Sequence, residues 1–134
     1  MTGLAEYIDA KQGVCFEWGR NDCLSFVSGA LGRQGLPELP SEWIGGYETS
    51  KGALRHYRRL LTKTGHVNIV DAMDALYDRA VTLYPDDGMI AARPEGGVLG
   101  FAFGVVHRGV IVFLIEDGIV EQHVTACDIF WRVS

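Results

Sequence analysis

Apolar residues recur at helical spacing in four stretches of the first 80 residues. The clearest stretch follows the polar pair Asn21-Asp22, both good N-cap residues, and places its apolar positions on one helical face. Those positions are Cys23, Phe26, Val27, Ala30 and Leu31. The pattern predicts helices over residues 3–12, from residue 23 to a glycine at 32 or 35, from a Ser50 cap to Gly65, and from an Asn68 cap to Ala80.

The pattern changes after Pro85 to short apolar runs of strand length. Strands are expected over residues 89–92, 98–106, 110–116, 119–124 and 129–133, and Asp117-Gly118 is a strong hairpin signal. Helices followed by an antiparallel meander are typical of an α+β fold. We therefore predict one domain over residues 1–134, with a helical part (1–84) packed on an antiparallel sheet of about five strands (85–134).

Residues 36–49 form the longest predicted loop and contain two prolines and the pair Gly45-Gly46. Trp43 and Tyr47 are the large side chains within it. Such residues either anchor a loop on the core or form interface hot spots, and both alternatives fit this loop equally. Trp43 and Tyr47 are therefore the candidate partner-contact residues, whereas Trp18 and Trp131 are expected to cap the core.

Composition narrows the class of protein. The net charge of −5 argues against a nucleic-acid binder, and a cationic cluster around Arg55–Lys63 is read as the solvated face of a helix. No apolar run is long enough to span a bilayer, and the N-terminus does not resemble a signal peptide. We expect the chain to be made in the cytoplasm and to have no membrane span.

The three cysteines, Cys15, Cys23 and Cys127, form no metal-binding pair and are odd in number. We expect neither a zinc site nor a disulfide framework, although the spacing leaves a Cys15–Cys23 bridge open. No phosphate-binding glycine loop or calcium loop is present, so the sequence predicts no cofactor and no metal.

Cys23 is the candidate catalytic residue because it lies in the first turn of a predicted helix. Free N–H groups and the helix dipole favour an anion there, and the thiolate is the reactive form of cysteine. A nucleophile is one interpretation. The other is a small buried residue that starts a helix, which is common because free cysteine is among the most buried residue types.

Five short motifs are spread over nearly the whole chain. They are Trp18-Gly19-Arg20-Asn21-Asp22-Cys23, Gly46-Tyr47, Leu99-Gly100, Asp117-Gly118 and Trp131-Arg132-Val133. In these motifs the chain resembles a family of small phage-encoded proteins related to the NlpC-type, papain-like cell-wall cysteine peptidases.

Genes of this family usually lie in the tail module of long-tailed phages and gene transfer agents. The resemblance implies a virion component of the tail tip or baseplate in a multi-copy assembly. Its implied partners are the tail hub and distal tail proteins, with peptidoglycan as a substrate in some members.

A cysteine peptidase also needs a base within hydrogen-bond reach of the thiol. Aligning Gly100 with the family's glycine places Val98 where the peptidase histidine should be. In a meander, His107 and His123 fall at the opposite edge of the sheet, roughly 20 Å away at the usual rise per residue.

The polar residues expected near the thiol are Arg93, Glu95 and Glu116, and none is a good base for a thiol at neutral pH. The catalytic set is therefore incomplete. We expect a structural tail-tip protein with a degenerate peptidase fold. The alternative is an active peptidase or amidase that cuts peptidoglycan during DNA entry, with a base from a rearranged histidine or a partner subunit. A third, more distant alternative is a soluble assembly chaperone that is absent from the virion.

Overall fold

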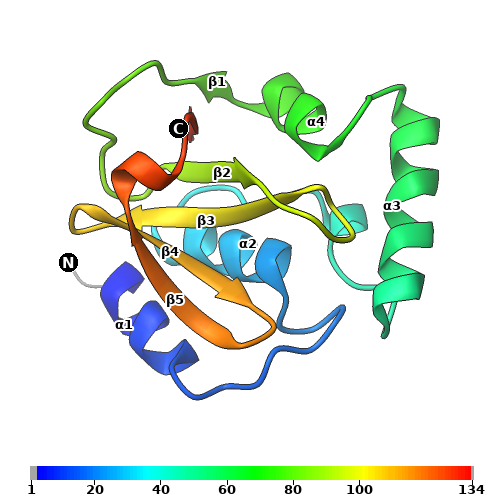
Figure 1. Cartoon of the computed structure of the whole chain (residues 1–134), viewed down its shortest axis with the longest axis horizontal. Coiled ribbons are helices and arrows are strands. Elements are labelled where there is room, and N and C mark those ends of the chain that lie inside the picture. The colour runs from blue at the N-terminus through cyan, green and yellow to red at the C-terminus, as the bar shows by residue number, and fades with distance from the viewer. Residues whose placement is uncertain (1–2, 134) are drawn as a thin grey trace.

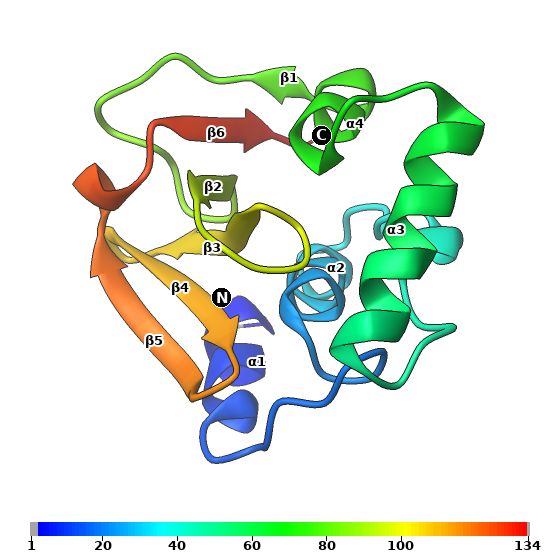
Figure 2. The same cartoon turned by 45° about the vertical axis from the view of Figure 1, so that its right-hand side comes forward.

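Four α-helices precede the sheet in the computed structural model, which describes residues 3–133. They are α1 (Gly3–Lys11), α2 (Cys23–Arg33), α3 (Ser50–Thr64) and α4 (Ile69–Leu76), with the 3₁₀ turn η1 (Ser41–Trp43) between α2 and α3. Figures 1 and 2 show α2 at the centre of the molecule, between the sheet and α3. The predicted order of helices first and sheet second is confirmed.

The sheet has six strands, one more than the pattern predicts, in the order β1-β6-β2-β3-β4-β5, and every neighbouring pair is antiparallel. The strands are β1 (Asp78–Arg79), β2 (Ile90–Pro94), β3 (Phe101–His107), β4 (Val110–Ile115), β5 (Gly118–His123) and β6 (Ile129–Arg132). A second 3₁₀ turn, η2 (Val124–Ala126), joins the last two strands. Strands β2 to β5 form the predicted meander, and β6 returns to pair with β2.

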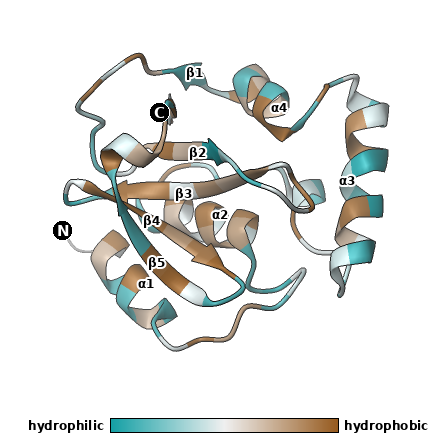
Figure 3. Ribbon diagram, in the orientation of Figure 1, coloured by the Kyte–Doolittle hydropathy of each residue, from teal (hydrophilic) through white to brown (hydrophobic). Residues whose placement is uncertain are grey.

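The central strands are apolar without alternation because both of their faces are buried. In β4, Val112 and Leu114 join the main core with α2, while Ile111 and Phe113 join a second cluster with Phe130. Figure 3 shows the resulting hydrophobic strands next to α2, and the hydrophilic outer side of α3. The run over residues 110–115 therefore indicates a central strand rather than a half-exposed one.

The helix starts follow the sequence signals with one correction. Asp22 caps α2 in a capping box with Ser25, and Asn68 caps α4 as predicted. The N-cap of α3 is Thr49, whose side chain accepts from the Gly52 N–H, and not the predicted Ser50. Ser50 is instead the first residue inside the helix.

The fourth helix is shorter than predicted: it ends at Leu76, and the chain then forms β1. The helical stripe predicted to reach Ala80 is wrong, because the backbone N–H of Ala80 bonds the carbonyl of Phe130 in a sheet-like connection. Asp74 fixes this junction by accepting hydrogen bonds from Arg79 and from the indole N–H of Trp131, at 2.7 Å and 2.8 Å. Tertiary contacts thus override the local helical pattern.

Asp74 gives the fold an acid-sensitive contact. The hydrogen bond from Arg79, and a weaker contribution from Trp131, hold the pKa of Asp74 below its ordinary value despite partial burial. The stabilisation is therefore present above the unfolded pKa of about 3.9 and is lost as the pH falls through the lower folded pKa. Replacing Asp74 by Asn should cost about 1 kcal/mol at pH 7 and much less at pH 2, measured by urea unfolding. An unchanged difference at the two pH values would contradict this.

No helix in the described part of the chain is long and apolar enough to cross a membrane.

Candidate functional site

The motif at residues 18–23 folds into a closed turn in front of α2. Glu17 and Asn21 form a β-bridge across it, and the Gly19 N–H donates to Asp22 at 2.9 Å. Asn21 donates to the carbonyl of Cys15 and accepts from Lys11. The turn is thereby tied to the linker before it, and Cys23 follows as the first residue of α2.

Asp22 connects this turn to the loop over residues 36–49. Its carboxylate is buried, caps α2 through the Ser25 N–H, and accepts the hydroxyl of Tyr47 at 2.8 Å. The Tyr47 and Tyr57 hydroxyl oxygens lie 2.7 Å apart, and Tyr57 donates to the carbonyl of Trp43. Burial raises the pKa of both tyrosines well above the ordinary value, so both stay protonated at neutral pH.

Trp43 and Tyr47 are therefore core residues, and their assignment as partner-contact residues is not supported. Trp43 is 5% exposed and Tyr47 is 8% exposed. The hydroxyl of Tyr47 is bonded to the buried Asp22, so the loop folds on the body of the protein. Of the two alternatives left open by the sequence, the structure favours the core. Trp131 is fully buried as expected, and Trp18 is half-buried.

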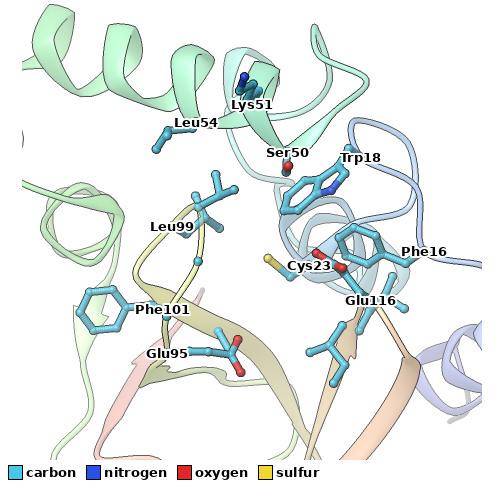
Figure 4. A pocket seen from close by; sticks show the side chains of 16 residues that line it. Phe16, Trp18, Cys23, Ser50, Lys51, Leu54, Glu95, Leu99, Phe101 and Glu116 are labelled. Atoms are coloured by element: carbon cyan, nitrogen blue, oxygen red, sulfur yellow. The ribbon is translucent and has the colours of Figure 1, made fainter.

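A cleft of about 410 Å³ opens over the first turn of α2. The start of α3 forms one wall, the linker before α2 forms another, and the β2–β3 and β4–β5 connections form the remainder (Figure 4). Most of the lining is apolar. The large apolar side chains that line it are Phe16, Trp18, Leu54, Leu99, Phe101, Leu114 and Ile115.

Cys23 lies in this cleft, and Figure 4 shows its sulfur pointing into the space between α2 and the β2–β3 loop. Burial, and next the charge of Asp22, raise the pKa of the thiol to about 12, although the backbone N–H groups of Phe103 and Leu24 act in the opposite direction. The helix start therefore does not produce an acidic thiol. At neutral pH the thiol is therefore protonated, whereas the thiolate is the nucleophilic form.

No histidine is among the described residues that line the cleft. His107 and His123 pair with the two sides of Val110, at the end of the meander away from the cleft, as the strand directions predict. His56 contacts the carbonyl of Glu42, and His66 pairs with Asp71 at 3.3 Å. The structure thus brings no imidazole to Cys23.

The carboxylates at the cleft were anticipated from the strand directions. Glu95 and Glu116 both line it, and so does Val98, the position where a peptidase histidine was sought. Arg93 pairs with Glu95 at 3.1 Å and is not part of the lining. This arrangement provides an apolar cavity with two carboxylates at its sheet side, of which Glu95 is paired with Arg93 and Glu116 is not.

Several lining residues were missed by the sequence reasoning. Phe16, Trp18 and Leu54 approach the cleft from the linker and from α3, and the predicted helical stripe marked Leu54 only as buried. No local signal identifies them, because their convergence depends on how α3 packs beside the sheet. All three cysteines are free thiols, so the Cys15–Cys23 bridge that the spacing left open is not formed.

Comparison with known proteins gives one match. The model of the family described as a domain of unknown function (DUF6950) matches residues 1–133. Neither the search of curated proteins nor the search of solved structures gives a match.

Proposed function

The chain belongs to the DUF6950 family, whose description states no activity, and we propose that it is a non-catalytic binding protein of a phage-type tail tip or baseplate. In this role the protein has an NlpC-like fold in which the nucleophile position survives as Cys23. It is present in several copies and contacts the tail hub and distal tail proteins. The tail context rests on the motif resemblance alone.

The observation that carries the non-catalytic part is the chemistry around Cys23. The thiol lies in a cleft without a histidine among its described lining residues, and its pKa is raised to about 12. Thiol catalysis at neutral pH requires the opposite, a lowered pKa or an adjacent base. The volume of the cleft and its apolar lining suit the binding of a ligand or a partner segment.

The alternative is an active cysteine peptidase or amidase that cuts peptidoglycan. It is favoured by the position of the Cys23 sulfur at the start of α2, facing an open cleft (Figure 4). A partner subunit would have to supply the base. The two functions differ in the reactivity of this thiol.

Alkylation of Cys23 should be slow at neutral pH and should keep rising to at least pH 10 without a plateau, because the thiol pKa is raised to about 12. The measurement uses the Cys15→Ser/Cys127→Ser protein and iodoacetamide, with mass-spectrometric readout. The variant that also carries Cys23→Ser reports background labelling. In urea, Cys23 should label at the rate of a model thiol.

A plateau below the model thiol value of roughly 8.5 in the folded protein would overturn the non-catalytic proposal and favour the peptidase. The tail assignment has its own test, which is mass spectrometry of particles purified from a strain that encodes the protein. Recovery at a fixed ratio to the tail proteins would support the assignment. Absence from finished particles would contradict it and favour a soluble assembly chaperone.

A further inference from the structure

The outer face of α3 bears an uninterrupted row of cations, here called the basic stripe. Its members are Lys51, Arg55, Arg58, Arg59 and Lys63. All five are exposed, and the helix contains no acidic residue. None of the five is in an ion pair of the described structure, whose Lys and Arg pairs involve Arg79, Arg93 and Arg132.

The basic stripe is unfavourable for the isolated helix. Neighbours such as Arg55 and Arg59 are four residues apart on one face, where like charges repel. It also concentrates five of the twelve Lys and Arg residues in a chain whose net charge is −5. A segregated positive face on an acidic protein is complementary to a negatively charged partner.

The basic stripe is continuous with the cleft. The side chains of the basic stripe form a shallow, open hollow along α3 itself, and Lys51 and Leu54 line both this hollow and the cleft that contains Cys23. Figure 4 shows Lys51 and Leu54 at the α3 side of the cleft. From Lys51 to Lys63 the helix rises about 18 Å, the length of five or six extended residues. One extended ligand can therefore occupy the cleft and follow the stripe.

The two ends of this path differ in charge, which selects among anionic partners. Glu95 and Glu116 line the sheet side of the cleft and disfavour a chain that carries a phosphate at every unit. The basic stripe contains no aromatic residue on which bases could stack. None of the exposed large apolar side chains lies on α3, so this face has no group to insert into a bilayer. A peptide with an apolar residue at one end, for the cleft, and acidic residues along the remainder, for α3, fits all three observations.

We propose that the cleft and the basic stripe together bind an extended acidic segment of a partner protein, with an apolar side chain in the cleft and carboxylates along α3. The inference rests on the proposed non-catalytic binding role and names the kind of partner for that site. The apolar lining supplies an anchor pocket, and the exposed cations select for negative charge and orient the segment. Lys51 and Leu54 are the points where the two parts meet.

Fluorescence anisotropy of the full chain tests the proposal with a labelled peptide of one phenylalanine, one glycine and six glutamates. A peptide with glutamines in place of the glutamates is the control ligand. We expect binding of the acidic peptide only, weakened by rising salt. The variant Arg55→Glu/Arg59→Glu should bind it at least tenfold more weakly. The matched variant Arg108→Glu/Arg132→Glu has the same net charge and should bind as the wild type does.

Equal binding of the two peptides, or no binding at millimolar concentration, would overturn the proposal. So would a larger affinity for a duplex DNA of the same charge or for phosphatidylglycerol vesicles. Circular dichroism of each variant verifies folding. Equal losses of affinity in the two charge-reversal variants would show that only net charge matters, and would refute binding at the basic stripe. If the acidic peptide does not bind and Cys23 alkylates slowly, only the acidic partner is refuted. If Cys23 alkylates as an acidic thiol, the non-catalytic role is refuted.

Discussion

Replacing Asp22 by Ala is expected to lower the free energy of unfolding by about 3 kcal/mol. The change removes the N-cap of α2, which alone is worth about 1 kcal/mol. It also leaves the part-buried Gly19 N–H and the buried Tyr47 hydroxyl without their acceptor, and each unsatisfied donor costs about 1 kcal/mol or more. Thermal unfolding should show a decrease in Tm of roughly 10 °C.

Asn68→Ala is the matched control, because Asn68 also caps a helix but accepts only one backbone N–H, that of Asp71. It should cost about 1 kcal/mol. The double variant Asp22→Ala/Tyr47→Phe should be less destabilised than the sum of the two single changes, because both remove the same hydrogen bond. Equal costs for Asp22→Ala and Asn68→Ala would show that Asp22 acts as a cap alone.

The fold class could be predicted because the apolar pattern changes sharply along the chain, from helical spacing to short runs of strand length. The helix end at Gly65 and the cap at Asn68 are local signals. The Asp117-Gly118 pair correctly predicts a hairpin between β4 and β5, but the two-residue turn is Glu116-Asp117, and Gly118 pairs with Ile115 as the first residue of β5. β1 could not be predicted, because it is two residues long and depends on the distant Phe130 and Trp131. Asp74 bonds the Trp131 indole from α4, and the apolar helical pattern of the sequence continues past the end of that helix.

The candidate site was predictable only along the strands. In an antiparallel meander the chain order alone decides at which end of the strands a residue lies. It therefore places Glu95 and Glu116 at the end near Cys23, and His107 and His123 at the opposite end. Burial of the thiol is a property of the packed molecule. The sequence weighed the helix dipole, whereas the structure adds desolvation and the neighbouring Asp22, which raise the pKa of Cys23.

The loop over residues 36–49 shows the same limit. Its two aromatic side chains carry the composition of an interface, and sequence alone could not decide between interface and core. The deciding contact joins residues 25 positions apart, the Tyr47 hydroxyl and the Asp22 carboxylate. The partner surface that we propose is instead α3, whose cations the sequence assigned to a solvated helix face.

Gly19→Ala is expected to lower the free energy of unfolding by about 4 kcal/mol, at least as much as Asp22→Ala, because it acts on the backbone that positions the loop over residues 36–49. Gly19 has φ of +83°, and a Cβ there would lie 2.0 Å from the carbonyl oxygen of Tyr47. That atom is backbone, so the turn and the loop would have to move apart, and the Tyr47–Asp22 hydrogen bond would be strained or lost. Gly13→Ala is the matched control, since Gly13 has φ of +78° and nothing within 4 Å of the added atom.

The control should cost about 1 kcal/mol, the penalty for the left-handed backbone alone. The difference between the two variants, about 3 kcal/mol, then measures the contact between the turn at residues 18–23 and Tyr47. Separation of the turn from the loop also loosens the first turn of α2, so Cys23 should alkylate faster in Gly19→Ala than in Gly13→Ala under native conditions. Equal unfolding free energies and equal labelling rates in the two variants would mean that the close approach of Gly19 to Tyr47 neither holds the loop nor shields the thiol.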